Sequence, residues 1–141
     1  MTYALAWPLQ KAIYERLLTD PAVAAIAGGR VFDAAPAWSG PAEAEGPYAV
    51  LGEESVRDWS SVEAGGAAHV LTVSVFGTER GFAQAKRLAG TISEALTAGD
   101  LVPERGRVAS VAFLDARARR EARGRLRRID LRFRARVEDD A

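Results

Sequence analysis

The clearest pattern along the chain is a strict alternation near its C-terminus. Apolar side chains occupy every second position from Ile129 to Val137. The positions between and before them carry charge: Arg128, Asp130, Arg132, Arg134 and Arg136. Because successive residues of a strand point to opposite faces, this pattern predicts a strand at the edge or rim of a sheet. One of its faces is expected to be buried and the other covered by guanidinium groups.

Helical spacing marks three other segments. Apolar residues three or four positions apart predict a helix over residues 7–19. Asp20 followed by Pro21 predicts the N-cap and first residue of a short second helix, which stops at Gly28. A third helix is expected after Thr78 as N-cap and before Gly99. Its apolar stripe consists of Phe82, Ala85, Ala89, Ile92 and Leu96.

Extended segments rich in β-branched and aromatic residues separate these helices. We expect a polar hairpin tip at 117–124 and loops at 34–46 and 58–67. The strands are expected at residues 31–33, 47–57, 69–76, 107–116 and 123–137. This order predicts an α+β fold, a mainly antiparallel sheet of about four to five strands with helices packed on one face. The length of 141 residues fits a single domain, 1–141.

The composition narrows the class of protein. No apolar run approaches the about 20 residues needed to cross a bilayer, so we expect no membrane partner. The N-terminus lacks the basic region and long apolar core of a signal peptide. The absence of cysteine excludes disulfides and thiolate metal sites, and it suits a cytosolic origin.

The chain is formally neutral, but its charge is unevenly distributed. Residues 1–66 hold four basic and nine acidic groups, whereas residues 104–137 hold twelve arginines and four acids. Such a chain can satisfy its charges internally, or it can meet a copy of itself head to tail. Arginine outnumbers lysine by seventeen to two, which favours ion pairs and phosphate contacts or reflects high-GC codon use.

Candidate catalytic and ligand-binding residues are few. The lone histidine, His69, is expected to open a strand without a neighbouring carboxylate in sequence, so a catalytic role is disfavoured. No metal-ligand, Walker or glycine-rich dinucleotide motif is present, and we expect no metal and no cofactor. The adjacent carboxylates Glu53 and Glu54 are expected on opposite faces of a strand, paired with the arginine-rich strands. The sequence therefore predicts a binding protein and no enzyme.

Three interpretations of the arginine-rich strands stay open. They can dock on a neighbouring subunit or partner, which we prefer. They can face solvent on an edge strand, or contact DNA phosphates without base specificity. Trp38 and Trp59 fall in the two loops and are interface anchors or fold back over their own domain. The candidate interface arginines are Arg117, Arg119, Arg120, Arg128, Arg132, Arg134 and Arg136.

The layout of the whole chain resembles a known family. A helix Leu-Gln-Lys-Ala-Ile-Tyr-Glu-Arg-Leu-Leu (9–18) is followed by Asp-Pro-Ala-Val (20–23) and Gly-Gly-Arg-Val-Phe-Asp-Ala-Ala-Pro (28–36). Then come Pro-Tyr-Ala-Val-Leu-Gly-Glu-Glu (47–54), a strand ending at Val75-Phe76, a long helix and two closing strands. This order resembles the tail-completion, or tail terminator, proteins of long-tailed bacteriophages and phage-derived gene transfer agents.

The resemblance implies a structural virion protein, made in the bacterial host cytoplasm and located at the head-proximal end of the tail. It implies a hexameric ring that caps the tail tube, stops its growth and joins the tail to the head, with a central channel for DNA passage. The implied partners are further copies of the chain, the major tail tube protein, the stopper or connector protein, and DNA passing without sequence specificity. A head–tail stopper ring protein and a small nucleic-acid-binding module are the alternatives.

Overall fold

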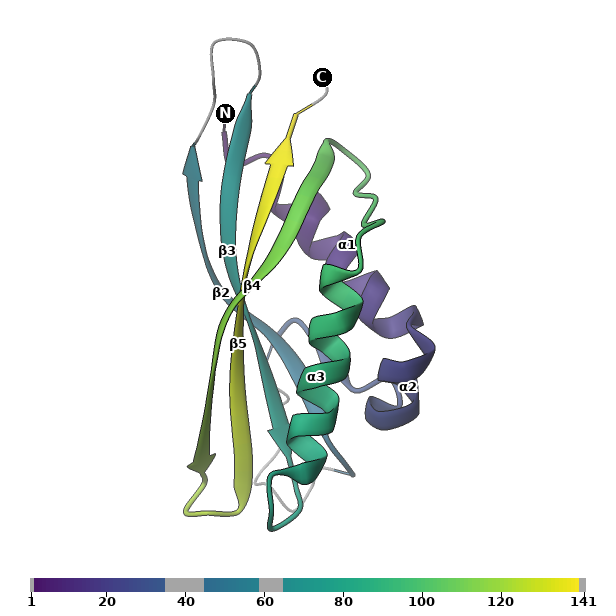
Figure 1. The fold of residues 1–141 in the computed structure, drawn as a ribbon, viewed down its shortest axis with the longest axis vertical. Coiled ribbons are helices and arrows are strands. Elements are labelled where there is room, and N and C mark those ends of the chain that lie inside the picture. Colours follow the sequence, from purple (N-terminus) through teal and green to yellow (C-terminus); the bar gives the residue numbers. More distant parts are fainter. Residues whose placement is uncertain (1, 35–44, 59–64, 140–141) are drawn as a thin grey trace.

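In the computed structural model, which describes residues 2–34, 45–58 and 65–139, a twisted sheet carries three helices on one face (Figure 1). The helices are α1 (Ala6–Thr19), α2 (Pro21–Ala27) and α3 (Ala83–Thr97). The strands are β1 (Val31–Phe32), β2 (Tyr48–Asp58), β3 (Gly66–Gly77), β4 (Arg107–Glu121) and β5 (Leu126–Glu138). The predicted α+β class with a mainly antiparallel sheet is confirmed.

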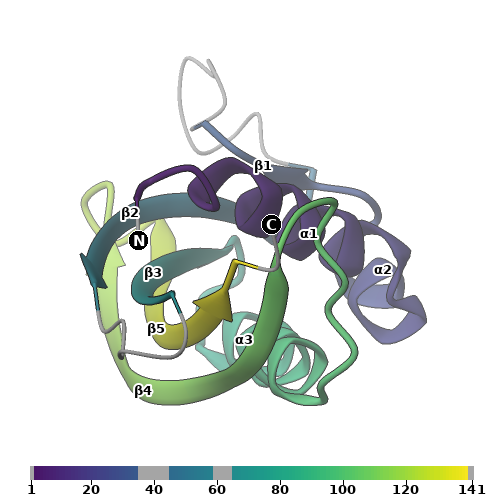
Figure 2. The same cartoon turned by 90° about the horizontal axis from the view of Figure 1, so that it is seen from above.

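The strand order across the sheet is β1-β2-β3-β5-β4. In the described part of the chain, β1 pairs with β2 in parallel and the other three pairs are antiparallel. Seen along the strands, β1 and β4 lie on opposite sides of the molecule (Figure 2). Because β5 is flanked by β3 and β4, the predicted edge position of the alternating strand is wrong. The alternation of apolar and charged residues shows which face of the strand is buried, but it does not show which strands pair with its two edges.

The two C-terminal strands form a longer hairpin than predicted. β4 continues to Glu121 and β5 begins at Leu126, so the turn shrinks to residues 122–125. Most of the predicted polar tip is therefore strand. Ala122 and Arg123 adopt left-handed backbone conformations, with φ of 52° and 57°. This conformation lets the amide of Gly124 donate to the carbonyl of Glu121 at 3.0 Å, closing the turn.

The two predicted loops are partly outside the described residues. Asp58, Gly66 and Ala67 belong to β2 and β3, so the predicted second loop is too wide. Residues 35–44 and 59–64 are not among those described. Arg30 ties together the chain on either side of the first of these segments. Its Nε donates to the carbonyl of Pro47 at 3.0 Å, and its Nη2 to that of Ile26 at 3.4 Å.

The short helix α2 forms as its sequence predicts. The Oδ1 atom of the N-cap Asp20 accepts hydrogen bonds from the amides of Ala22 at 2.9 Å and Val23 at 3.1 Å. Pro21 fills the first helical position, and Gly28, at φ 57°, ends the helix.

Helix α3 begins later than predicted. Phe82 occupies its N-cap position without a side-chain hydrogen bond. Thr78 lies before an additional turn, where its amide donates to Oε1 of Gln84 at 2.8 Å. None of the helices in the described residues is long and apolar enough to span a membrane.

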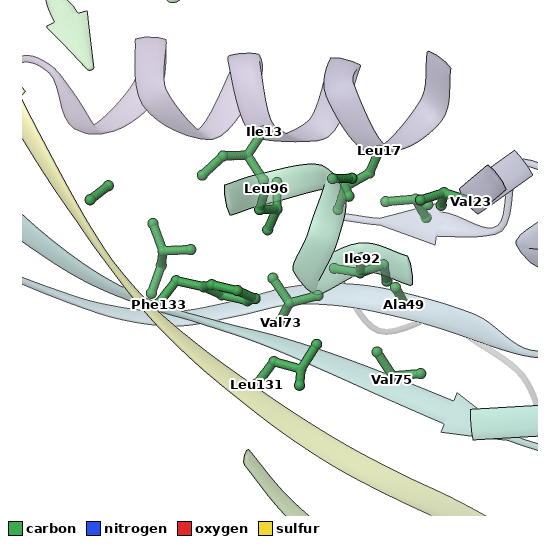
Figure 3. Packing of buried hydrophobic residues seen from close by; sticks show 14 of the residues in the cluster. Ile13, Leu17, Val23, Ala49, Val73, Val75, Ile92, Leu96, Leu131 and Phe133 are labelled. Carbon is green, nitrogen blue, oxygen red and sulfur yellow. The ribbon is translucent and has the colours of Figure 1, made fainter. Parts of the chain in front are cut away.

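The hydrophobic core lies between the helices and the sheet. Phe133, at the middle of β5, is fully buried there. Side chains from both layers belong to the same cluster: Ile13 and Leu17 from α1, Ile92 and Leu96 from α3, and Val73 and Leu131 from the sheet (Figure 3). Burial of this apolar surface, at roughly 25 cal/mol per Å², is the main stabilising contribution to the fold.

The start of β4 approaches the N-terminal part of the chain closely at Gly106. This residue has φ of +79°, and a Cβ atom there would lie 2.8 Å from the carbonyl oxygen of Glu138 and 2.9 Å from Cδ1 of Leu5. Gly99 also has a positive φ, of +90°, but open space surrounds its Cβ position. An alanine at Gly99 would introduce backbone strain alone, whereas an alanine at Gly106 would introduce both strain and steric overlap. Comparing the two positions therefore separates the two effects.

We expect Gly106→Ala to lower the free energy of unfolding by roughly 2–4 kcal/mol, because it combines a strained φ with a clash against backbone. Gly99→Ala is the control and should cost only about 1 kcal/mol, since it introduces the strain alone. Urea denaturation of both variants measures the difference. Equal losses would contradict the close approach at Gly106.

Candidate interaction surfaces

The face of the sheet opposite the helices carries polar side chains from the long strands. The strand register places Ser74 of β3 beside Asp130 of β5, and Asp130 beside Arg117 of β4. On β5, alternate residues from Ile129 to Val137 are buried against the helices, which confirms the predicted two-faced strand. We call the opposite surface the polar face.

Four charged residues of the polar face form a closed network near the β4–β5 turn. Arg128 donates to Oε1 of Glu121 and to Oδ1 of Asp130, both at 2.9 Å. Arg119 lies 3.2 Å from the Glu121 carboxylate and 3.6 Å from that of Asp130. Ser74 donates to Asp130 at 2.6 Å. Two guanidinium groups and two carboxylates thus neutralise each other.

A second ion pair continues this half of the polar face. Arg132 Nε and Nη2 donate to the Asp115 carboxylate at 3.0 and 2.8 Å, and these hydrogen bonds lower the pKa of Asp115. Both residues line a hollow of roughly 550 Å³, together with Arg119, Arg128 and Asp130 of the network and with Arg117 and Glu53. Since its walls alternate in sign, the hollow suits a surface that also carries both charges.

The other half of the polar face also carries arginines. Arg57 of β2 and Arg134 and Arg136 of β5 surround a hollow of roughly 410 Å³. Among the described residues, no carboxylate forms an ion pair with Arg57 or Arg134. These two guanidinium groups can therefore bind carboxylates or phosphates from another molecule.

Glu53 and Glu54 point to opposite faces, as predicted, but their partners differ from those predicted. Glu53 lines the hollow of the polar face. Glu54 lies on the helix-covered face, where it accepts a hydrogen bond from the Tyr3 hydroxyl and lies 3.8 Å from Nδ1 of His69. Within the described residues neither carboxylate forms an ion pair with an arginine, so the predicted pairing is wrong. The bulge in β2 between Leu51 and Glu54 shifts both side chains relative to the arginine rows.

His69 lies inside β3 and not at its start. It is fully buried, and neither ring nitrogen has a hydrogen-bond partner in the described part of the chain. Burial lowers the pKa of His69, and the Glu54 carboxylate offsets this effect only in part. The imidazole is thus held neutral in the core, which fits a structural role.

The hairpin arginines are divided between the two faces of β4. Arg117 and Arg119 belong to the polar face. Arg120 belongs to the helix-covered face, where its guanidinium lies 5.8 Å from the centre of the Phe82 ring. Trp38 and Trp59, the predicted aromatic anchors, lie outside the described residues.

A groove between α3 and β4 is the surface that the sequence did not predict. Gly90 of α3 and Phe113 of β4 line it, and Phe113 is 48% exposed. Gly90 inside a helical pattern was the available signal, because glycine lowers helix stability and such a cost usually has a packing or functional reason. Gly90 indicates a groove only once β4 is known to lie beside α3, and the sequence does not show this arrangement.

The chemistry of these surfaces is that of charge pairing and apolar contact. In the described part of the chain, no group of three or more histidine, aspartate or glutamate side chains is placed to hold a metal ion. The fold and its charged surfaces are those of a small α+β domain that can contact other molecules through ion pairs and apolar side chains.

Comparison with known proteins gives the family. A family model described as tail completion protein gp17 matches residues 11–138, and the chain belongs to this family. A chain in the solved structure described as "Virion of native gene transfer agent (GTA) particle" is similar, with 44% identity and a TM-score of 0.87. The match covers 97% of this chain and 99% of that chain. No curated protein sequence matches. The resemblance drawn from the sequence is confirmed.

The network around Asp130 predicts a stability effect that depends on pH. Burial raises the pKa of Asp130, but hydrogen bonds from Ser74 and Arg128 outweigh it, so the pKa lies below its ordinary value of 3.8. The charge of Asp130 therefore stabilises the fold above that pH, and this contribution is lost as the pH falls through the folded-state pKa. Asp130→Asn should cost about 1–3 kcal/mol at neutral pH and progressively less below about pH 4.

Urea denaturation across this pH range tests the prediction. Asp115→Asn is the matched control and should cost less, because its ion pair with Arg132 is exposed and screened by solvent. A loss from Asp130→Asn that does not change with pH would contradict the charge network as its cause.

His69 predicts a second, independent dependence on pH. Because the folded-state pKa of His69 lies below the ordinary 6.5, this histidine binds a proton more readily in the unfolded chain than in the folded one. Wild-type stability should therefore be complete above about pH 6.5 and decline below it. In His69→Leu this decline should largely disappear. Thermal unfolding at a series of pH values measures it, and parallel curves for the two proteins would count against a buried, neutral His69.

Proposed function

We propose that this protein is a tail terminator of a gene transfer agent or long-tailed phage. The whole chain acts as one domain, and its copies form a hexameric ring at the head-proximal end of the tail tube. The ring stops tube growth and joins the tail to the stopper or connector of the head. Its central channel lets DNA pass without sequence specificity, and the protein itself catalyses no reaction.

The observation that carries this proposal is the 44% identity to a chain of a gene transfer agent virion, across nearly the full length of both chains. Membership of a tail completion family supports the same position in the particle. The physical properties of the chain agree with it, since a ring needs two different surfaces that fit each other on every copy. The uneven charge of a formally neutral chain supplies surfaces of opposite sign.

The candidate interface residues take different places in this proposal. Arg119 and Arg128 are largely occupied by Glu121 and Asp130, and they stiffen the hairpin. Arg117, Arg134 and Arg136 line the hollows of the polar face, with Glu53. We propose these as contacts with the neighbouring copy, with the tube or stopper, or with DNA in the channel. We also propose Trp38 and Trp59 as aromatic anchors of these contacts.

A stopper ring protein is the second candidate from the same assembly, and position within the particle separates the two. A nucleic-acid-binding module would bind duplex DNA as a free subunit, with an affinity that falls steeply with salt. The polar face argues against that role, because Asp115, Glu121 and Asp130 already neutralise much of it.

Electron microscopy of particles from a producing strain that lacks this protein tests the function. We expect free tails of unregulated length beside DNA-filled heads without tails, because tube growth is no longer stopped. Restoring the gene should return joined particles. Normal, infectious particles from the deletion strain would overturn the proposal.

Two arginines of the polar face allow a finer prediction. Arg57→Glu combined with Arg134→Glu should lower the yield of joined particles at least about tenfold while leaving folding intact, because neither guanidinium forms an ion pair with a carboxylate of the described residues. Arg80→Glu combined with Arg87→Glu changes the net charge equally on a different surface and should leave the yield unchanged. Equal yields from both double variants would contradict a docking role for the polar face.

A further inference from the structure

The groove between α3 and β4 has a composition that suits a protein partner. It has a volume of roughly 290 Å³. Small and apolar side chains form most of its lining: Ala89, Gly90, Phe113, Ala116, Ala118 and Leu131. Lys86, near the start of α3, also lines it and gives it a basic end.

Three cations meet at this basic end, around the ring of Phe82. Lys86 Nζ lies 6.0 Å from the ring centre, and the guanidinium carbons of Arg120 and Arg127 lie at 5.8 and 5.7 Å. Arg127 is only 7% exposed, and its Nη1 donates to the carbonyl of Gly124 at 2.5 Å, while its Nε has no partner in the described part of the chain. We call these four residues the Phe82 cluster.

The arginines on the two faces of the β4–β5 hairpin differ in whether carboxylates neutralise them. Arg119 lies directly opposite Arg128, and Arg120 directly opposite Arg127. Like charges at such positions repel each other. On the polar face, Glu121 and Asp130 neutralise the first pair.

On the groove side, no carboxylate of the described residues forms an ion pair with Arg120, Arg127 or Lys86. Three positive charges thus gather around one aromatic ring at the end of an apolar groove. Attraction to the ring offsets only part of their repulsion. A carboxylate from another molecule would supply the charge that this side of the hairpin lacks.

Gly90 gives an independent indication that the groove is kept open. It lies inside α3, where glycine is about 1 kcal/mol less favourable than alanine. A Cβ atom at this position would meet no atom within 4 Å, so packing within the subunit does not explain the glycine. A side chain there would instead project into the groove that Gly90 lines.

We propose that the groove and the Phe82 cluster bind the β1–β2 edge of a second copy of this chain. This inference rests on the proposed ring and names its contact. Residues 107–138 carry eleven arginines and four acids, whereas residues 31–58 carry six acids and one base. The strands within these segments, β4 with β5 and β1 with β2, form opposite sides of the sheet (Figure 2). Head-to-tail contact therefore brings surfaces of opposite charge together at every junction.

Exposed acids are available on the acidic side. Asp33 follows β1, and Glu45 and Glu53 flank or belong to β2; all three are exposed. Beyond the two residues that pair with β1, the outer edge of β2 from Leu51 to Asp58 has no strand partner among the described residues. Both the charge and the open strand edge on this side suit association with another copy.

A second copy fits this groove better than DNA does. Binding to the phosphate backbone of DNA requires positive charge, and it makes no use of an apolar groove. Protein interfaces combine an apolar, well-packed centre with charged residues at the rim, which is the arrangement of the groove and the Phe82 cluster. The formal neutrality of the whole chain also matches copies that neutralise one another.

Photo-crosslinking identifies the occupant of the groove directly. The chain contains no cysteine, so a single Ala118→Cys carries a benzophenone label at one defined site. We expect mass spectrometry of irradiated particles, or of concentrated purified protein, to place the crosslink within residues 31–58 of another copy. Ser110→Cys, on the opposite face of β4, is the labelled control and should not give this crosslink. A crosslink from Ala118→Cys to DNA, to a different protein or to another region of the chain overturns the inference.

Charge reversal tests the Phe82 cluster. Lys86→Glu with Arg120→Glu should weaken self-association at least about tenfold by sedimentation velocity and in particle assembly. Arg80→Glu with Arg87→Glu, which alters cations outside the groove, should change it less than about twofold. Adding Asp33→Arg, Glu45→Arg and Glu53→Arg to the first variant should restore association, because each chain supplies both surfaces. Normal association of the first variant overturns the inference, and so does a weakened association that the added substitutions fail to restore.

Gly90 separates loss of binding from loss of folding. Gly90→Gln should raise the midpoint of thermal unfolding yet weaken association, whereas Gly90→Ala should raise the midpoint and weaken association less. Unchanged association of Gly90→Gln contradicts an occupied groove. If the deletion strain shows free tails and these variants assemble normally, only this inference fails. If the deletion strain makes normal particles, the proposed function fails whatever the crosslink reports.

Discussion

The packing of α1 and α3 against alternate side chains of β3 and β5 fixes both faces of the sheet at once. Phe133 and Val73 are fully buried beneath the helices. Because side chains alternate along a strand, this burial forces Arg132 and Arg134 onto the other face. A slip of one residue would place guanidinium groups in the core, so hydrophobic burial determines where the charges lie. The ion pairs then adjust a surface whose position is already set.

The β4–β5 hairpin shows how the same strand pair produces two kinds of charged surface. On the polar face, Arg128 is shared between Glu121 and Asp130, and the charges largely cancel. On the groove side, Arg120 and Arg127 contact an aromatic ring, and Arg127 also donates to a turn carbonyl. No carboxylate of the described residues forms an ion pair with either. The first arrangement stiffens the subunit. The second leaves positive charges that carboxylates of a neighbouring copy can neutralise in an assembly.

Much of the fold follows from the sequence, but the lateral arrangement of its strands does not. The alternation around Phe133 predicts the two faces of β5, and Asp20-Pro21 predicts the start of α2. Strand order depends on long-range packing, so the interior position of β5 and the contact of Glu54 with His69 across β2 and β3 are absent from any local pattern. The groove could not be predicted from the sequence for the same reason, because α3 and β4 lie side by side only in the folded sheet.

Arg30 has a consequence for how this chain can change. Its guanidinium donates hydrogen bonds to the carbonyls of Ile26 and Pro47, on either side of the segment 35–44. These bonds hold the two flanking parts of the chain together through residues that lie outside the segment. An insertion, a deletion or an exchange of residues within 35–44 would therefore leave α2 and β2 in place. The chain would then carry a different segment on an unchanged fold.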